Sequence, residues 1–340
     1  MKNSVKRKSK RIIIGTRGSK LALWQAAWVQ SELQKLYPDL VIELNKIKTT
    51  GDKILDVPLA KIGGKGLFVK EIEEALLKHH ADIAVHSMKD VPTEFPENLH
   101  LAVICKREDP RDAFLSRIRN SQFTIRAFRE LPNGALVGTS SLRRSCQLLN
   151  RRPDVKIKQL RGNLDTRIRK LDEGQFEAII VAAAGVKRLG LKDRITEILS
   201  DDVSLPAIGQ GAIGIECRVN DETINNLIAP LNHPETAVCV KAERAFLERL
   251  EGGCQVPIAA HARIKQRAKS KGRGDSNSQS LLVMDGLVGS ISGDRIIKGH
   301  IEGSTEQAES LGLTLADDIL SRGAREILDE VYGRGIPKVS

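Results

Sequence analysis

One cysteine of this chain lies in a sequence context suited to presenting a thiol. Cys254 is part of the run Glu-Gly-Gly-Cys-Gln-Val-Pro, residues 251–257. The two glycines leave space around the sulfur, and the proline fixes the backbone just beyond it. A thiolate needs access to act as a nucleophile, so this loop predicts a cysteine that becomes covalently modified. The alternative is a small side chain buried in a turn, because free cysteine is often buried.

One carboxylate is suited to acid–base chemistry. Asp90 lies in the run Val-His-Ser-Met-Lys-Asp-Val-Pro, residues 85–92, directly after apolar residues typical of a strand. Strand ends in α/β sheets face the ligand crevice, so we expect Asp90 to exchange a proton or stabilise a cationic intermediate. Lys89 is expected to hold a phosphate or carboxylate. A surface Lys-Asp turn is the alternative. His86 can act as a general base, although a histidine in a strand is more often a packed side chain.

Two segments share a pattern in which a strand is followed by Gly-Thr, hydroxyl residues, arginine and a helix. They are Ile-Gly-Thr-Arg-Gly-Ser at 14–19 and Val-Gly-Thr-Ser-Ser-Leu-Arg-Arg at 137–144. The free N–H groups of a helix start, hydroxyls and guanidinium groups together suit a carboxylate or phosphate. Either segment alone can also be an ordinary Ser/Thr N-cap with solvated arginines. One such segment in each of two α/β lobes predicts a shared anion-binding cleft.

A third basic turn places arginines around a glycine. It reads Leu-Arg-Gly-Asn-Leu-Asp-Thr-Arg at 160–167, and Lys187 and Arg188 follow further along. Several arginines predict a ligand with several carboxylates, although any one of them can be a solvated surface residue.

A glycine-rich run, Lys-Ile-Gly-Gly-Lys-Gly-Leu-Phe-Val-Lys at 61–70, precedes an amphipathic helix. It lacks the Gly-Lys-Ser/Thr ending of a P-loop, so it gives little support to nucleotide binding. We expect a mobile lid with Phe68 near the cleft, and a plain flexible connection is the alternative.

The elements that must position these residues follow an α/β pattern over about the first two thirds of the chain. Strand-like and helix-like runs alternate at 12–14, 21–36, 81–86, 135–137, 142–149 and 178–183. This alternation predicts α/β domains with parallel sheets and crossover helices. Breaks at 110–112 and 205–211 indicate that the chain leaves one domain, builds a second and returns, as in a hinged two-domain binding fold.

The expected domains are 1–111 with 212–231, then 112–211, then 232–340. The last holds a helix at 236–250, the cysteine loop and strand-like runs at 281–283 and 295–300, which predicts a small α+β domain. Residues 265–279 contain no core-forming side chains and are expected to form a disordered insertion.

Composition limits the possible protein classes. The 340 residues suffice for two or three domains. The five cysteines are scattered without metal-ligand or Cys-x-x-Cys spacing, so we expect no disulfide framework, no metal site and a reducing cytosol. The apolar run after the basic N-terminus is too short for a signal peptide or membrane span, which predicts a cytoplasmic protein. A short targeting segment is the alternative.

The net charge of +11 and the pI near 9.5 predict an anionic ligand. Nucleic acid is disfavoured, because aromatic residues make up only 3% of the chain and no zinc-finger or basic-zipper pattern occurs. A small polyanion fits better.

Together these motifs resemble the hydroxymethylbilane synthase family, whose members are also called porphobilinogen deaminases. The resemblance runs in consistent order over roughly residues 11 to 260, through segments 16–23, 85–92, 138–144, 160–163, 209–212, 243–244 and 251–257. It implies two hinged periplasmic-binding-protein-like α/β domains and a small C-terminal α+β domain. It also implies a transferase of haem and tetrapyrrole biosynthesis. Such an enzyme condenses four porphobilinogen molecules head to tail, releasing ammonia and then linear hydroxymethylbilane.

The resemblance also implies roles for individual residues. Cys254 would carry a dipyrromethane cofactor through a thioether, and Asp90 would assist deamination and stabilise positive charge on the pyrrole intermediates. The residues expected to bind the cofactor are Lys89, Asp90, Thr139, Ser141, Arg143, Arg144 and Arg167. Those expected to bind the acetate and propionate groups of the substrate are Arg17, Ser19, Arg161, Arg167 and Arg188. The expected partners are porphobilinogen and the growing oligopyrrole, with a monomeric protein and neither nucleic acid nor membrane.

The chain departs from the family pattern in the basic insertion at 265–279 and at Ala259 and Ala260. Two other functions stay open. A non-enzymatic two-lobed protein that binds a small polyanion would use the arginines but would not need Asp90 or an accessible Cys254. A basic nucleic-acid-binding protein would show an affinity that falls steeply with added salt.

Overall fold

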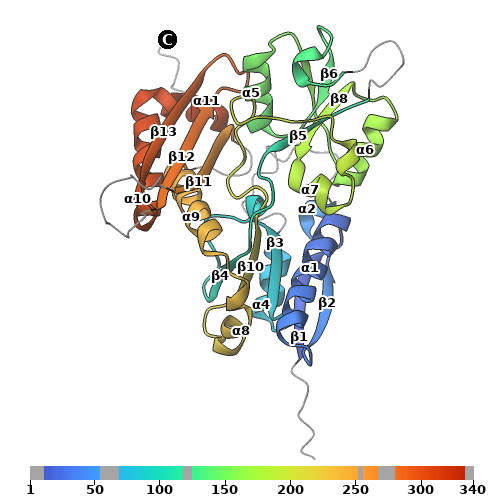
Figure 1. The fold of residues 1–340 in the computed structure, drawn as a ribbon, viewed down its shortest axis with the longest axis vertical. Helices are drawn as coiled ribbons and strands as arrows, with labels where there is room; N and C mark the ends of the chain where they lie inside the picture. The colour runs from blue at the N-terminus through green and yellow to red at the C-terminus, as the bar shows by residue number, and fades with distance from the viewer. Residues whose placement is uncertain (1–10, 54–68, 118–124, 252–255, 267–279, 334–340) are drawn as a thin grey trace, which may run out of the picture.

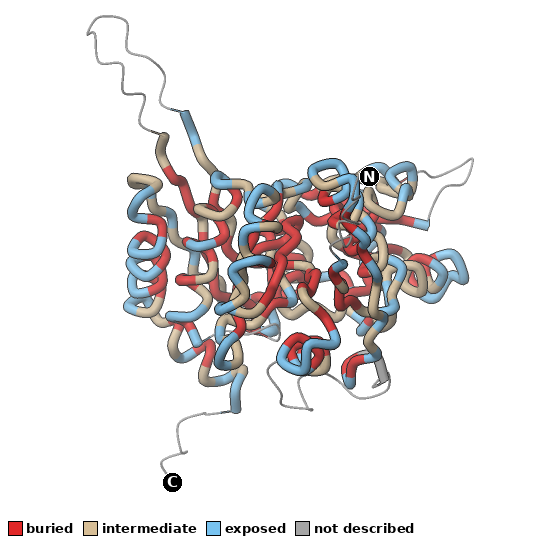
Figure 2. The backbone as a smooth tube through the Cα atoms, turned by 90° about the horizontal axis from the view of Figure 1, so that it is seen from below, coloured by how far each residue is buried: buried red, intermediate tan, exposed pale blue. Residues whose placement is uncertain are grey.

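The computed structural model describes residues 11–53, 69–117, 125–251, 256–266 and 280–333. Within these residues the chain forms three sheets with helices packed on them (Figure 1). In Figure 1 the second five-stranded sheet lies above the first, and a three-stranded sheet lies beside both. The buried residues run through the interior of each sheet-and-helix unit, and exposed residues face outward (Figure 2). Each unit therefore has its own hydrophobic core.

The first sheet has the strand order β2-β1-β3-β10-β4. Its strands are β1 (Arg11–Arg17), β2 (Val41–Ile47), β3 (Ile83–Ser87), β4 (Leu99–Ile104) and β10 (Ile213–Arg218). The helices packed around it are α1 (Lys20–Leu36), α2 (Thr50–Lys53), α4 (Lys70–Leu77) and α8 (Glu222–Ile228). Ile12 and Ile14 of β1 are buried against apolar residues of α1, which explains why this short apolar run becomes a central strand.

The second sheet repeats this arrangement with the order β7-β6-β8-β5-β9. Its strands are β5 (Asp112–Ser116), β6 (Leu136–Gly138), β7 (Lys156–Lys158), β8 (Ala178–Ala182) and β9 (Glu197–Ile198). Its helices are α5 (Leu142–Arg151), α6 (Leu164–Asp172) and α7 (Ala183–Arg188). Gly138 ends β6 where a Cβ atom would lie 2.8 Å from the Phe176 ring, so close packing requires glycine there.

The α/β class predicted from the alternation is confirmed, but the prediction of parallel sheets is only partly correct. Three neighbouring strands in each sheet are parallel. In the first sheet β10 pairs antiparallel with β3 and β4, and in the second β5 pairs antiparallel with β8 and β9. The reason is the chain path: β5 and β10 are entered directly from the two segments that cross between the sheets, rather than through a crossover helix.

The two crossing segments, 105–111 and 205–212, lie side by side. Glu108 N–H donates to Gly211 O at 3.1 Å, and the Gln210 amide donates to Pro110 O at 2.6 Å. Gly211 has a φ of +89°, and a Cβ atom there would lie 2.3 Å from Glu108 O. Glycine is therefore required at the point where the segments approach most closely. The domain boundaries expected from the sequence stay a prediction.

The third sheet is antiparallel, with the order β11-β12-β13. Its strands are β11 (Ile258–Gln266), β12 (Ser280–Gly289) and β13 (Ile296–Ser304). Helices α9 (Pro234–Arg249), α10 (Ala308–Ile319) and α11 (Arg325–Tyr332) complete the unit. This is the expected α+β architecture. The described part of the expected insertion, Lys265 and Gln266, belongs to β11 and pairs with β12, and residues 267–279 lie outside the described residues.

Both faces of the third sheet are covered by other parts of the chain. One face covers α9, α10 and α11 in a core that includes Phe246 and Leu315. Its other face meets the second sheet's unit, where Leu205 contacts Ala259 and Leu287. Helix α9 contacts both β11 and β4, and in Figure 1 it lies between the third sheet and the first. The third unit is thus attached to both of the others.

Candidate active site

The turn that carries Asp90 begins at the end of β3, beside the crossing segments. Ser87 ends the strand and hydrogen-bonds the Gln25 side chain of α1 at 2.8 Å. A short 3-10 turn, η1 (Met88–Asp90), follows. Gly209 packs so closely on this turn that a Cβ atom would lie 2.8 Å from Met88 Cβ. Asp90 is exposed and Lys89 is half-buried, so the structure places the expected carboxylate where a ligand can reach it.

Cationic groups from the second sheet's unit lie within electrostatic range of this turn. Burial is the main cause that lowers the pKa of Lys89 to about 8; the charges of Arg144 and Arg167 act in the same direction, and those of Asp90 and Asp112 oppose it. Burial is also the main cause that lowers the pKa of Arg167 to about 10; the charges of Arg144 and Arg161 act in the same direction, and that of Asp90 opposes them. The structure therefore brings Lys89, Asp90, Arg144, Arg161 and Arg167 together at the junction of the two sheets, with more positive than negative charge.

Arg144 and its neighbour Arg143 have a carboxylate partner within the chain itself. Arg144 Nη2 and Arg143 Nη1 lie 2.7 and 2.8 Å from the carboxylate of Asp112, and both arginine side chains are buried. Although burial acts to raise the pKa of Asp112, the two guanidinium groups hold it well below its usual range. We expected both arginines to meet the carboxylates of a ligand; in the structure they meet Asp112, and ligand binding by them stays a prediction.

The hydroxyl residues at the two helix starts serve as caps. Ser19 Oγ accepts from Ala22 N–H at 3.3 Å at the start of α1, and Ser141 Oγ accepts from Arg144 N–H at 3.4 Å at the start of α5. Thr139 is buried, and its hydroxyl accepts from Ser141 N–H at 3.2 Å. The N-cap alternative left open by the sequence is therefore correct for both serines. Their contacts with a ligand stay a prediction.

The remaining predicted arginines lie around the same junction. Arg167 Nε donates to Gly162 O at 2.8 Å, in the basic turn before α6. Arg188 Nη2 donates to Gly211 O at 2.7 Å, and its guanidinium lies 5.6 Å from the centre of the Trp24 ring of α1. Arg188 thus links the two sheets at the crossing segment. Arg17 ends β1 and is half-buried.

The remaining candidates from the sequence are His86, Cys254 and Phe68. His86 is buried in β3, where its Nε2 lies 2.9 Å from Glu216 Oε2, so the packed-side-chain alternative is correct. Cys254 and Phe68 lie outside the described residues. The four described cysteines are free and buried, and burial is the main cause that raises the pKa of each of their thiols to about 11 or 12. Those four are poor thiolate nucleophiles. They are Cys105, Cys146, Cys217 and Cys239.

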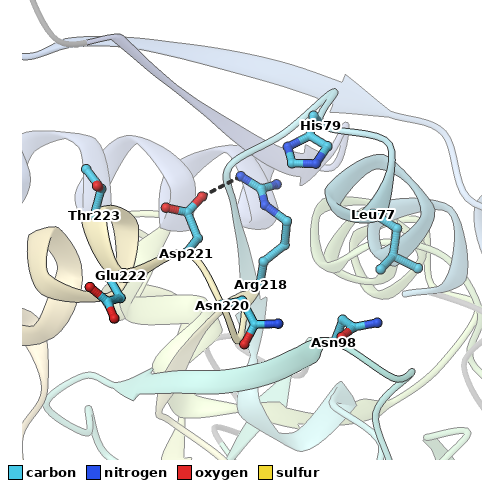
Figure 3. Close-up of a pocket in the computed structure, with 8 residues that line it drawn as sticks. All are labelled: Leu77, His79, Asn98, Arg218, Asn220, Asp221, Glu222 and Thr223. Atoms are coloured by element: carbon cyan, nitrogen blue, oxygen red, sulfur yellow. Dashed lines mark hydrogen bonds and ion pairs between the residues drawn. The ribbon is translucent and has the colours of Figure 1, made fainter.

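A surface pocket in the first sheet's unit does not belong to this site. It lies at the opposite end of β10 from the Asp90 turn, because Ile213 pairs with Ser87 whereas Arg218 pairs with Leu99. Arg218 points into it but is paired with Asp221 at 2.8 Å (Figure 3). The pocket is lined by Leu77, His79, Asn98, Arg218, Asn220, Asp221, Glu222 and Thr223. The guanidinium of Arg218 already pairs with the carboxylates of Asp82 and Asp221, so the pocket does not have the features of an anion site.

Reasoning from the sequence missed the carboxylates that organise the site. Asp112 binds both arginines and also accepts from the Gln210 amide at 2.9 Å. Glu243 of α9 is fully buried and binds the Arg107 guanidinium at 2.6 and 3.0 Å. The run Pro-Arg-Asp at 110–112 marked a domain exit but gave no sign that its aspartate would pair with arginines 31 and 32 positions later.

Comparison with known proteins relates the chain to one family. The family model described as porphobilinogen deaminase, dipyromethane cofactor binding domain, matches residues 12–226, and the model for the porphobilinogen deaminase C-terminal domain matches residues 237–321. The porphobilinogen deaminase of Geobacter metallireducens is 56% identical over 329 residues, covering 97% of each chain. That of Pelobacter propionicus is 57% identical over 323 residues, covering 95% of this chain and 98% of its own.

Solved structures with a similar outline share little sequence with this chain. The probable amino-acid ABC transporter extracellular-binding protein YtmK of Bacillus subtilis aligns with a TM-score of 0.39 at 15% identity, covering 66% of this chain and 90% of its own. The aliphatic sulphonate binding protein SsuA of Escherichia coli aligns with a TM-score of 0.37 at 15% identity, covering 71% of both. The family models and the relatives, by contrast, span nearly the whole chain, and the chain belongs to the porphobilinogen deaminase family.

Proposed function

We propose that this chain is a hydroxymethylbilane synthase. It condenses four porphobilinogen molecules head to tail on a dipyrromethane cofactor, releases ammonia at each addition, and releases linear hydroxymethylbilane by hydrolysis. The observation that carries the proposal is the junction of the two sheets, where one exposed carboxylate, Asp90, lies among Lys89, Arg144 and Arg167. A site with one acid and several cations suits a reaction on a substrate that is rich in carboxylates.

The residues present fit the cofactor. A dipyrromethane carries several carboxylates, and the junction holds more guanidinium and ammonium groups than carboxylates, even after Asp112 is counted against Arg143 and Arg144. Lys89 and Arg167 are the cations that would hold the acetate and propionate groups, together with Arg144. When bound, the cofactor supplies the pyrrole carbon to which the first substrate is joined.

Within this site Asp90 would act on the substrate. Departure of ammonia from the aminomethyl group leaves positive charge on the pyrrole, and a fixed carboxylate beside the ring stabilises that charge. The same carboxylate can accept the proton that must leave a pyrrole carbon when the new bond forms. The cations around it would bind the carboxylates of the substrate and keep its ring beside Asp90, which lowers the entropic cost of the reaction.

We propose that Cys254 is the attachment site. A thioether requires an accessible thiolate, and the four described cysteines are buried with raised thiol pKa values. Cys254 lies in the glycine-flanked run that follows α9 in the sequence. The lid role of Phe68 and the substrate contacts of Arg17, Ser19, Arg161 and Arg188 belong to the same proposal.

Intact-mass measurement tests the proposed attachment. The purified protein is expected to be heavier than its sequence by two linked pyrrole units, and Cys254→Ser is expected to lack the addition. Cys239→Ser, which changes a buried described cysteine, serves as the matched control and is expected to keep it. A wild-type chain that stays unmodified after incubation with porphobilinogen would refute the proposed function and favour a non-enzymatic two-lobed anion-binding protein.

We also propose a monomeric cytoplasmic protein without nucleic-acid or membrane partners. No helix in the described part of the chain is both long and apolar enough to cross a bilayer. Light scattering at micromolar concentration tests the monomer, and an oligomer would contradict it. Binding to a random DNA duplex, measured at two salt concentrations, tests the nucleic-acid alternative: tight, salt-sensitive binding would favour it.

A further inference from the structure

Arg244 of helix α9 holds the loop that follows the Asp90 turn. Its Nη2 donates to Pro92 O at 2.6 Å and to Thr93 O at 3.2 Å, and its Nη1 donates to Val91 O at 3.3 Å. The guanidinium also lies 5.6 Å from the centre of the Phe95 ring. One side chain of the third unit therefore binds the carbonyl groups of the three residues that follow Asp90 in the sequence.

The hydrogen-bond partners of Arg244 are backbone carbonyl groups. Within the described residues its hydrogen bonds go to carbonyl oxygens, and no carboxylate lies in ion-pair contact with it. Burial lowers the pKa of Arg244, which reflects the cost of removing its charge from water, and the charge of Glu248 in the same helix opposes this shift without a direct ion pair. A guanidinium that binds only backbone carbonyls gives up the stronger interaction with a carboxylate. The hydrogen bonds of Arg244 instead fix the backbone conformation of residues 91–93.

Apart from Arg244, that loop is held mainly by apolar packing, because Val91 and Phe95 belong to a cluster that includes Val240 of α9. Residues 91–98 lie between η1 and β4 and belong to no strand or helix. Pro92 has no N–H group to donate. The Val91 N–H closes the η1 turn on Met88 O at 3.2 Å. Arg244 thus supplies from another unit the hydrogen bonds that a sheet neighbour would give to a strand.

The preceding residue of α9 anchors a different part of the site. Glu243 accepts from the Arg107 guanidinium, from Gly209 N–H at 2.7 Å and from Ala262 N–H at 2.9 Å. These partners belong to the two crossing segments and to β11. Adjacent residues of one helix therefore bind the crossing segments and the Asp90 loop, and the same helix leads toward Cys254 in the sequence.

From this arrangement we propose that Arg244 is a positioning residue for the reaction, which fixes the Asp90 turn to helix α9 by binding the carbonyl groups of residues 91–93. The inference rests on the proposed function, in which Asp90 acts on a chain attached at Cys254. It assigns to Arg244 the task of keeping the Asp90 turn in one position relative to helix α9 while pyrrole units are added. A displacement of about 1 Å at a reacting group can reduce a rate about 100-fold.

The test compares Arg244→Gln and Arg244→Lys with a matched control, Arg249→Gln. Arg249 lies in the same helix but forms an exposed ion pair with Asp317. The readouts are the cofactor mass, kcat and KM for ammonia release, and hydrogen exchange of residues 91–95. Arg244→Gln is expected to keep the cofactor, to lower kcat by about 10- to 100-fold with little change in KM, and to exchange faster at 91–95. Arg244→Lys keeps the positive charge but replaces the planar guanidinium, which can donate to several carbonyl groups at once, with a single ammonium. An intermediate kcat is therefore expected.

The possible results separate this proposal from the proposed function. If the wild-type chain has no cofactor and releases no ammonia, the proposed function fails. If the wild-type chain is active and Arg244→Gln has the same kcat, or unchanged exchange at 91–95, the role of Arg244 is refuted. Should Arg244→Gln fail to fold, Arg244→Lys decides: a lowered kcat with faster exchange at 91–95 supports the proposal, and wild-type values overturn it.

Discussion

Replacing Glu73 with glutamine is expected to stabilise this protein above neutral pH. Glu73 lies in α4 with 8% of its surface exposed, within electrostatic range of His86 and Glu216. Burial is the main cause that raises the pKa of Glu73 from 4.5 to about 7; the charge of Glu216 raises it further, and His86 acts in the opposite direction. The folded state thus favours a protonated Glu73, and ionising this carboxyl costs folding free energy.

The sign and size of the effect follow from linkage. A carboxyl whose pKa is raised on folding favours the folded state below pH 4.5, and this contribution is lost as pH rises through about 7. At about 1.4 kcal/mol for each pKa unit, the full shift corresponds to about 3 kcal/mol. Water that reaches the carboxylate screens part of this, so we expect Glu73→Gln to gain about 1–3 kcal/mol more at pH 8 than at pH 5.

Urea denaturation followed by circular dichroism at pH 5 and pH 8 measures this difference. The control is Glu74→Gln, which changes the next residue of α4, an exposed glutamate that pairs with Lys78. The free energy of unfolding of the control is expected to follow that of wild type at both pH values. If Glu73→Gln changed this free energy equally at pH 5 and pH 8, the reasoning about the buried carboxyl would be refuted.

Two other predictions concern charges at the junction of the sheets. Asp112→Asn leaves the guanidinium groups of Arg143 and Arg144 buried without their carboxylate, so a loss of about 3–5 kcal/mol in urea denaturation is expected. Asp154→Asn removes the carboxylate of a partly exposed pair with Arg152 and is expected to have a much smaller effect, and equal losses would contradict the role of Asp112. Because the pKa of Lys89 is about 8, KM for porphobilinogen is expected to rise between pH 7 and pH 9 as the ammonium deprotonates. Lys89→Arg should abolish that rise, and an unchanged pH dependence would exclude Lys89 as a carboxylate ligand.

Local patterns in the sequence were sufficient to predict the elements that carry the site. The apolar run at 12–14 and the serine at position 19 predicted β1 and the start of α1, because a strand core and an N-cap are both decided by neighbouring residues. The run before Asp90 was correctly placed at a strand end for the same reason. Helix α10 was missed although Ala308, Leu311 and Leu315 recur at helical spacing.

Contacts between distant residues could not be predicted in this way. Strand β10 is antiparallel because the chain re-enters the first sheet at residue 213 from the second crossing segment. The pattern of apolar residues within β10 is also compatible with a parallel strand. Likewise, nothing near Arg143 and Arg144 reveals that Asp112 will neutralise them. Arg244 belongs to segment 243–244 of the family resemblance, but its partners at 91–93 lie about 150 positions earlier in the sequence.

The most direct test of this account is the turnover of Asp90→Asn. The variant is expected to carry the same mass addition as wild type, because cofactor attachment is proposed to depend on Cys254. Its rate of ammonia release from porphobilinogen is expected to fall by about 100- to 10,000-fold, as for the loss of a positioned acid–base group. Glu97→Gln, at an exposed glutamate of the following loop, should keep the wild-type rate. Wild-type ammonia release by Asp90→Asn would contradict the central claim that this carboxylate carries out the chemistry.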